Sequence, residues 1–485
     1  MIADEKMETN SRVLTATDDG NYVGMHDITS MPSPRSDHTV VLFDLAAFGM
    51  KPRMYISNGC NGNQLVQYNQ TCPLWSNTAG ETLCVKSYCT AITASTVYFT
   101  PDTSEFTTVS AAAPSGARYR AAAAGVGRKL YIFGGRTLPS PLGGDDMALV
   151  VANVDILDTV TNEWDAPVVV GQAGGLASAL SRADIVSDGG AFSSGNCIYL
   201  VGGYDSTYAA VATLIRIDVT QTPSWDVTTL SPMPTPRGDI TVQLFRGEFY
   251  VMGGWNSAFS EAVTTVESYK IDSASGGTGT WTSRPSMKYA RGDLASGVIS
   301  NALFAIAGEQ RDAVRDPLGD KRLSFPVQWV TKFTLSSNEF VDEQPLTLNR
   351  FRFVGASYNS SSSYLSSAIY LFGGQSDYDP ECSCYKTVST TLKYIPVSTY
   401  TRQFSGRKLS DGDIAGIVIG TLTAAGCILL AVVSYILYRK RGYFTKQDVQ
   451  LSSMQMQKLG GEGDDTADDV EVVELGGAGH KHVRL

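Results

Sequence analysis

Histidine is scarce in this chain, with four among 485 residues. Two of them, His480 and His482, lie in the C-terminal tail, so only His26 and His38 precede it. The sequence also lacks a GxSxG nucleophile elbow, a phosphate-binding P-loop and any CxxC pair. These absences argue against a histidine-rich metal centre, a serine hydrolase and a nucleotide-dependent enzyme. We therefore expect no enzymatic activity, and predict no catalytic residue, no metal and no cofactor.

Positive charge is also in short supply. The formal net charge is −10 and the isoelectric point is near 5.0, which argues against a nucleic-acid partner. Charged residues make up 18% of the chain and hydrophobic residues 43%, so a sizeable core is affordable. Seven carboxylates lie between Glu462 and Glu474 in a glycine-rich stretch. This composition is typical of a disordered segment, and we expect 439–485 to be an acidic disordered cytoplasmic tail.

The sequence has no apolar run at its start but a long one near its end. Residues 1–20 contain no signal-peptide core. Residues 414–438 contain no charge and are long enough to span a bilayer as a single helix, and a basic triplet follows at 439–441. We expect 401–413 to be a stalk, 414–438 a transmembrane helix and the domain that precedes them to be extracellular or lumenal. Gly416, Gly420 and Ala424 form a small-residue stripe that predicts self-association of this helix.

Internal repeats dominate the rest of the chain. A strand that ends in two glycines recurs at Gly134–Gly135, Gly202–Gly203, Gly253–Gly254 and Gly373–Gly374, with degenerate copies at 54–59 and 303–308. An apolar strand, a polar turn and an aromatic residue follow, as at Trp164, Trp225 and Trp281. An arginine then opens the next unit: Arg35, Arg118, Arg182, Arg237, Arg291 and Arg350. Six units of about four short strands predict a six-bladed β-propeller.

The glycine pair, the tryptophan and the M-P-x-P-R link resemble the kelch repeat. The resemblance covers 20–400 and implies an all-β, six-bladed kelch-type propeller at 21–400, after an N-terminal extension at 1–20. The last unit lacks its aromatic strand, whereas the segment before Arg35 supplies one. We therefore expect the N-terminal strand to complete the last blade and close the ring. His38 occupies a position where kelch repeats often carry histidine, which implies a structural role.

Two RGD triplets occur, at 237–239 and 291–293. Integrin attachment is one interpretation. However, both triplets share a repeat position with RSD at 35–37 and RAD at 182–184, which favours a structural role. Because residues two apart on a strand face the same side, we expect the arginine and aspartate to make charge-assisted bonds within or between blades.

The cysteines and sequons favour an oxidising compartment. Six cysteines in polar loops are disulfide candidates: Cys60, Cys72, Cys84, Cys89, Cys382 and Cys384. Their pairing stays open, including a bridge between the two clusters, and a zinc site or free thiols are alternatives. Cys197 is predicted to be a buried core thiol. Asn69 and Asn359 head N-glycosylation sequons.

The leading functional hypothesis is a single-pass membrane protein whose propeller is a non-catalytic module that binds a protein or glycan. Its variable stretches are candidate contact surfaces: 60–90, 136–150, 204–210, 255–262, 309–326 and 375–387. One alternative is a galactose-oxidase-like or other carbohydrate- or peptide-active enzyme, which requires a perturbed carboxylate pair or a metal in the channel. Another is a membrane-tethered scaffold that faces the cytosol.

Overall fold

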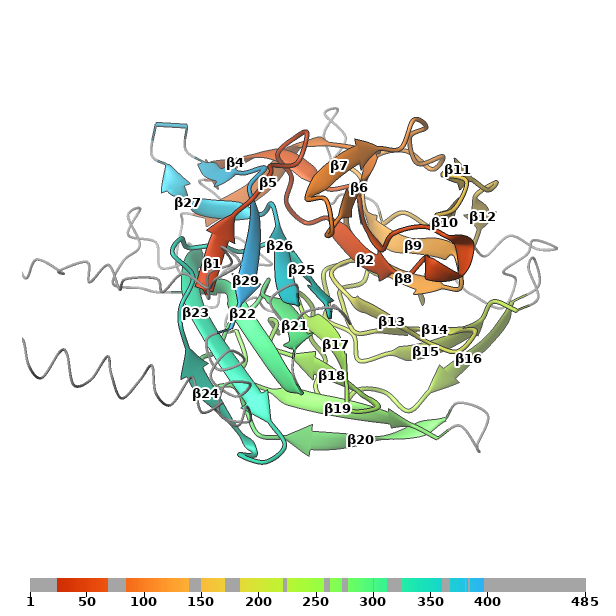
Figure 1. Ribbon diagram of the computed structural model, residues 1–485. Coiled ribbons are helices and arrows are strands. Elements are labelled where there is room, and N and C mark those ends of the chain that lie inside the picture. The colour runs from red at the N-terminus through yellow and green to blue at the C-terminus, as the bar shows by residue number, and fades with distance from the viewer. Residues whose placement is uncertain are drawn as a thin grey trace, which may run out of the picture. The chain divides into compact units, whose positions relative to one another are not determined.

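The computed structural model contains a six-bladed β-propeller, in agreement with the sequence (Figure 1). The structure describes 24–68, 84–138, 150–170, 184–220, 225–256, 262–272, 278–299, 301–311, 324–359, 367–379, 381–382 and 384–396. The chain divides into two units, 1–404 and 405–485, and the propeller belongs to the first. No helix within the described ranges is long and apolar enough to cross a membrane, and the predicted span at 414–438 lies outside them.

Each blade is an antiparallel sheet of four strands, and the second blade has a short fifth strand. From the axis outward, the first three blades consist of β2 (Thr39–Phe43), β3 (Arg53–Ser57), β6 (Thr96–Thr100) and β7 (Glu105–Thr108); β8 (Tyr119–Val126), β9 (Lys129–Arg136), β10 (Asn153–Asp158) and β11 (Glu163–Trp164), with β12 (Val168–Val169) on β10; and β13 (Gly190–Ser194), β14 (Cys197–Val201), β15 (Leu214–Asp218) and β16 (Asp226–Leu230).

The other three blades repeat this order. They consist of β17 (Thr241–Phe245), β18 (Glu248–Met252), β19 (Val266–Ile271) and β20 (Gly279–Arg284); β21 (Ala295–Ile299), β22 (Ala302–Arg311), β23 (Ser324–Thr334) and β24 (Glu339–Glu343); and β25 (Val354–Tyr358), β26 (Ala368–Phe372), β29 (Thr391–Ile395) and β1 (Gly24–Asp27). A single 3₁₀ turn, η1 (Ala46–Phe48), connects β2 to β3.

The N-terminal strand closes the ring, as the sequence predicts. Strand β1 pairs antiparallel with β29, with Gly24 opposite Ile395 and Asp27 opposite Leu392. The chain then enters the first blade through Met31, which is buried and whose backbone N–H donates to Ser389 O. The last blade therefore contains both ends of the propeller segment, and β29 has no open edge.

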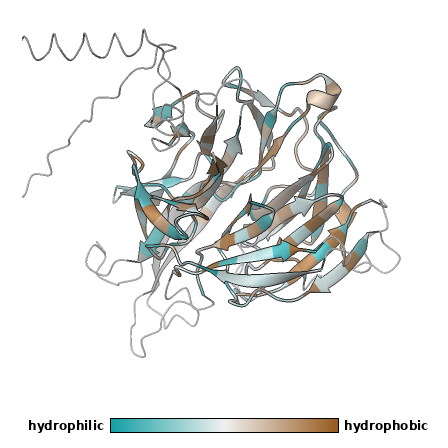
Figure 2. Cartoon of the chain, turned by 60° about the horizontal axis from the view of Figure 1, so that its bottom comes forward, coloured by the Kyte–Doolittle hydropathy of each residue, from teal (hydrophilic) through white to brown (hydrophobic). Residues whose placement is uncertain are grey.

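The hydrophobic core lies between blades. Six larger clusters of buried side chains each join two neighbouring blades. For example, Phe133 and Ile156 of the second blade pack with Ile198 and Trp225 of the third. Apolar and polar residues alternate along many of the strands (Figure 2), because successive side chains point to opposite faces of a sheet.

Two long hairpins extend the first and last blades. They are β4 (Cys60–Tyr68) with β5 (Cys84–Ile92), and β27 (Gln375–Asp379) with β28 (Cys384–Thr387). Asn63 joins them, because its Oδ1 accepts the Tyr385 N–H at 2.8 Å and its Nδ2 donates to Tyr385 O. The two hairpins thus add a second connection between the first and last blades.

Candidate functional site

The most unusual feature of the propeller is a closed ring of six charged residues around its axis. Five of them lie two residues before the first strand of a blade and Arg120 is the second residue of β8, and all six have a left-handed backbone, with φ between 51° and 61°. Each donates its N–H to the carbonyl of the equivalent residue in the preceding blade, over 2.8–3.1 Å, and Asp37 closes the circuit on Arg352. We call this set the axial ring: Asp37, Arg120, Asp188, Asp239, Asp293 and Arg352.

The left-handed conformation is expensive for residues other than glycine. It costs on the order of 1–3 kcal/mol per residue and tends to occur at functional sites. Arginine is a less usual occupant than aspartate, yet Arg120 and Arg352 both adopt it, with φ of 61° and 53°. The six backbone hydrogen bonds and the surrounding blades hold this conformation.

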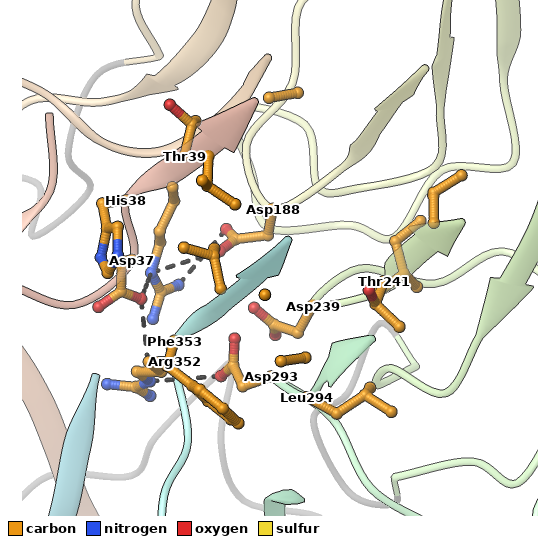
Figure 3. Close-up of a pocket in the computed structure, with 18 of the residues that line it drawn as sticks. Asp37, His38, Thr39, Asp188, Asp239, Thr241, Asp293, Leu294, Arg352 and Phe353 are labelled. Carbon is orange, nitrogen blue, oxygen red and sulfur yellow. Dashed lines mark hydrogen bonds and ion pairs between the residues drawn. The ribbon is translucent and has the colours of Figure 1, made fainter. Parts of the chain in front are cut away.

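The side chains of the axial ring form an unequal charge cluster (Figure 3). Arg120 lies between Asp37 and Asp188, with Nε 3.3 Å and 3.4 Å from their carboxylate oxygens. Arg352 lies between Asp37 and Asp293, with Nε 3.9 Å and 3.3 Å away. Three carboxylates therefore share two guanidinium groups, and the fourth, Asp239, forms no ion pair among the described residues.

Asp239 has the least compensated environment of the ring. Its side chain is 7% exposed, and its Oδ2 accepts a hydrogen bond from the Tyr204 hydroxyl at 3.1 Å. Its Oδ1 has no hydrogen-bond partner among the described residues. Burial, followed by the charges of Asp293 and Asp188, raises the pKa of Asp239 well above the usual value.

Asp293 and Tyr204 titrate abnormally for related reasons. Burial, followed by the charge of Glu309, raises the pKa of Asp293 well above the usual value, although Arg352 acts in the opposite direction. Burial, followed by the charge of Asp239, raises the pKa of the Tyr204 hydroxyl, which favours its role as a donor. The neighbouring His38 is 4% exposed, and burial lowers its pKa to about 3, so its imidazole is neutral.

The axial ring lines a cavity of about 190 Å³. Beyond the charged groups, the inner strands contribute small apolar side chains, which are Ala121, Ala122, Ala123, Ala191 and Ala295. Hydroxyl groups of Thr39, Thr241 and Ser296 also line it. The described residues include no group of three histidine, cysteine, aspartate or glutamate side chains that could hold a metal ion.

The repeat arginines lie two residues before the axial ring and have a different role. Arg35, Arg118, Arg237, Arg291 and Arg350 are at most 1% exposed. Arg237 pairs with Glu267 at 2.6 Å, and Arg118 pairs with Asp155. Arg291 instead donates to the carbonyls of Ala305, Ala307 and Trp329. These arginines hold the strands of a blade together, as charge-assisted bonds do.

The expectation that arginine and aspartate share one side of a strand is wrong. Asp239 and Asp293 precede strands β17 and β21, and their left-handed backbone directs them to the cavity while the arginines enter the blade. Both RGD arginines are fully buried, which opposes integrin attachment. The intervening glycine gives room to an aromatic side chain, because a Cβ at Gly292 would lie 2.1 Å from Trp255 Nε1.

The alignment of Arg182 with the other repeat arginines is also wrong. Arg182 itself lies outside the described residues. The backbone contact that the other arginines make is made by Val186, whose carbonyl accepts the N–H of Gly135 just as Arg237 O accepts that of Gly203. The third member of the axial ring is therefore Asp188, not Asp184. The R-A-D triplet resembled the repeat, but the chain reaches that position four residues later.

The glycine pairs and tryptophans lie where the repeat predicts. In each glycine pair both φ angles are positive, and in the degenerate copies Asn58 and Ala307 adopt the first of these conformations, with φ of 62° and 49°. Trp164 and Trp281 lie in the fourth strands of their blades and donate to the carbonyls of Ala111 and Ser231. Trp225 directly precedes the fourth strand β16.

The cysteine pairs are local. Cys60 is bonded to Cys89 and Cys382 to Cys384, so these two bridges lie within the separate hairpins rather than between them. Cys72 and the side chain of Cys84 lie outside the described residues. Cys197 has a free thiol and is partly exposed rather than buried. Its thiol has a raised pKa because of partial burial.

Other predicted features lie partly outside the described residues. Asn359 is exposed and donates to Val298 O at 3.3 Å, whereas Asn69 is not described. Gly416, Gly420 and Ala424 are not described either. Sequence reasoning missed Arg120, Asp188 and Arg352. A signal was present, because the residue two positions after the repeat arginine is charged in five units: Asp37, Arg120, Asp239, Asp293 and Arg352.

Comparison with known proteins supports the repeat and the fold. The kelch motif matches 117–167 and 236–288, which contain the second and fourth blades. Kelch-like protein terF from Aspergillus terreus is 26% identical over 198 residues, which cover 40% of this chain and 38% of terF. The solved structure of YjhT is 14% identical, with a TM-score of 0.52, and the match covers 75% of this chain and 95% of YjhT. This protein therefore contains a six-bladed β-propeller, and kelch repeats are found in its second and fourth blades.

Proposed function

We propose that the propeller is a non-catalytic binding module for a protein or glycan, and that one of its two faces makes the contacts. This face, called the ring face here, is where the second strand of each blade ends and the axial ring lies. Backbone bridges connect the two features, for example Ser187 with Tyr204 and Gly238 with Trp255. All six variable stretches of the sequence begin at this position of their blades.

The difference in length between the connections on the two faces carries the proposal. On the ring face, the connections include the hairpins β4–β5 and β27–β28 and the stretch 202–213. On the opposite face, the connections at 127–128, 195–196 and 246–247 are two-residue turns, and the equivalent connection of the first blade, 44–52, is longer. Long loops on a rigid scaffold commonly carry binding, whereas two-residue turns offer little surface. Kelch propellers generally bind proteins, which agrees with the proposed binding function.

Site-specific photo-crosslinking of the full chain tests this proposal. A photoreactive amino acid replaces Ser206, which is exposed on the ring face, or Ser336, which is exposed in the turn between β23 and β24 on the opposite face. We expect a discrete, reproducible adduct from position 206 and none from position 336. Adducts of equal yield from both positions, or from position 336 alone, would contradict the assignment of the binding face.

A second candidate function is catalysis by carboxylates in the cavity. Asp239 and Asp293 both have raised pKa values and both line the cavity, which meets the condition stated for the enzyme alternative. If this candidate is correct, D293N abolishes turnover of a carbohydrate or peptide library while the fold persists. Unchanged product profiles for the wild-type and D293N proteins would exclude it.

We also propose that a helix at 414–438 anchors the protein in a membrane, with the propeller outside the cytosol and 439–485 inside. The 25-residue charge-free run supports the anchor, and the Cys60–Cys89 and Cys382–Cys384 bridges support an oxidising compartment. Gel mobility of the full chain in native membranes, with and without glycan removal and reductant, tests this. Two mobility shifts are expected, and no shift under either treatment favours the cytosolic scaffold.

A further inference from the structure

We propose that the axial cavity binds a primary ammonium or guanidinium group carried on a short aliphatic stem, with Asp239 as the contacting carboxylate. The inference deepens the proposed binding function, and it rests on that function only where a partner protein supplies the cation. No acidic ligand is expected at this site.

Charge is the first argument. The axial ring places four carboxylates and two guanidinium groups around one cavity, so two carboxylates lack a matching cation. Asp37, Asp188 and Asp293 form ion pairs with these guanidinium groups. Negative charge is therefore least compensated around Asp239, which lies between Asp188 and Asp293 in ring order. A monocation at this position reduces the imbalance.

An unsatisfied atom is the second argument, and it is independent of the charge count. Asp239 is more than nine-tenths buried, it lines the cavity, and its Oδ1 has no hydrogen-bond partner among the described residues. The Tyr204 hydroxyl lies 3.1 Å from Oδ2 and 3.3 Å from the Trp255 carbonyl, so its proton is directed at these two acceptors and not at Oδ1. Figure 3 shows the carboxylates of Asp188, Asp239 and Asp293 turned toward the same space. Because an unsatisfied buried acceptor is costly, a donor from a ligand gains more here than at the surface.

The cavity wall selects the rest of the ligand. The small side chains of Ala121, Ala123, Ala191 and Ala295 leave an apolar wall beside the charged groups. The volume of about 190 Å³ exceeds the roughly 150 Å³ of an apolar cavity that accommodates benzene. A four-carbon stem therefore fits, with its methylene groups on the alanines and its cationic head at Asp239.

An organic cation fits this site better than a metal ion. Hard metal ions require several oxygen ligands within about 2.6 Å of one point, and the described residues offer no such group of three. Arg120 and Arg352 also occupy positions among the carboxylates. An ammonium or guanidinium group can instead donate to separate carboxylates with longer contacts.

Ligand-observed saturation-transfer NMR on the full chain tests the proposal. The probe is n-butylammonium, and 1-butanol is the neutral control of equal length. The test variant is D239N, and the matched control is D226N, which removes one carboxylate from the exposed outer strand β16. We expect saturable transfer to n-butylammonium with the wild-type and D226N proteins, and at least tenfold weaker binding to D239N. Thermal unfolding of the same samples checks that each variant is folded.

Three results would overturn the proposal: no transfer to n-butylammonium, equal transfer to 1-butanol, or equal losses in D226N and D239N. The peptide GGKGG, with GGQGG as its control, separates the two sources of the cation. If both GGKGG and n-butylammonium bind in separate experiments, a partner's lysine can supply the cationic group. If n-butylammonium binds and GGKGG does not, the ligand is a free amine. Because no partner is present, failure here is distinct from failure of the photo-crosslinking experiment.

Discussion

The repeat arginines and the axial ring lie two residues apart in the chain, yet their charges are managed in opposite ways. Each repeat arginine is buried among acceptors that belong to its own blade, such as Glu267 for Arg237 and backbone carbonyls for Arg291. The axial ring instead gathers side chains from all six blades and leaves carboxylates in excess. The repeat arginines thus connect the strands within one blade, whereas the axial-ring residues of all six blades together form a charged cavity.

The difference separates scaffold from site. A buried guanidinium group that donates to acceptors of its own blade contributes to the fold, whereas a carboxylate oxygen that faces a cavity without a partner among the described residues, as in Asp239, can still bind a ligand.

The largest effect is expected from deleting β1, the N-terminal strand that closes the ring. Deletion of residues 1–30 removes β1 and exposes the edge of β29, whereas Arg35 and Asp37 remain in the chain. We expect loss of the cooperative unfolding transition and aggregation in size-exclusion chromatography. Deletion of residues 1–20 leaves β1 intact and is the control. A soluble, cooperatively unfolding protein without residues 1–30 would mean that closure by β1 is dispensable.

Removal of one repeat arginine should be the most harmful single substitution. R237A leaves Glu267, which is 3% exposed, without its ion pair. Because an uncompensated buried charge remains, we expect a loss of about 3–5 kcal/mol in the free energy of unfolding. Chemical denaturation measures it, and E267Q in the R237A background should recover part of the loss. No recovery in the double variant would show that the arginine acts through its carbonyl contacts alone.

Loss of an axial arginine should be harmful to a smaller extent. R120Q removes the cation shared by Asp37 and Asp188. The expected loss is roughly 2 kcal/mol, less than for a fully buried pair, because these side chains line a cavity. Denaturation of R120Q and R237A side by side checks this order. If R120Q lowers the free energy of unfolding more than R237A does, the axial ring contributes mainly to stability.

Neutralising an axial carboxylate should have the opposite sign. D239N removes a charge that burial and neighbouring carboxylates disfavour, and keeps the shape of the side chain. We expect the free energy of unfolding at pH 7 to rise by on the order of 1 kcal/mol. D226N, at the exposed outer strand β16, should change stability less. A clear destabilisation by D239N would mean that its carboxylate is paired in the folded protein.

The pH dependence of stability should show the same contrast. Asp239 and Asp293 have folded-state pKa values above the unfolded value of about 4. Such groups stabilise the fold fully below that value, and this contribution is lost as pH rises through the raised folded-state pKa. We expect the D239N/D293N double variant to unfold with a weaker decline in stability over this range. Identical slopes for wild-type and double variant would contradict the raised pKa values.

Much of the fold could be predicted from the sequence, because each blade repeats the same short-range marks. Glycine pairs, aromatic fourth strands and link arginines recur at similar spacing, and the missing outer strand of the last blade matched the surplus strand at the N-terminus. The register of the third blade could not be predicted, since R-A-D at 182–184 imitates the link and Val186 takes the arginine's place.

The site was harder to predict than the fold. Alternation along a strand suggested that Arg237 and Asp239 point the same way, but the left-handed φ of 52° at Asp239 turns its carboxylate to the axis. Nothing local in the sequence shows that six positions spread over more than 300 residues meet at one point. Only closure of the ring brings Asp37 beside Arg352, and with it the charge imbalance.

The pairing of β1 with β29 has a consequence for how the chain could be cut. Gly24 lies opposite Ile395, so the start of one strand is next to the end of the other. A short peptide joining them would make an ordinary hairpin like the one between β23 and β24, where Thr334 lies opposite Glu339. The propeller could then be opened at that second hairpin. We therefore expect a circular permutant with its termini in the turn 335–338 to form the same six blades.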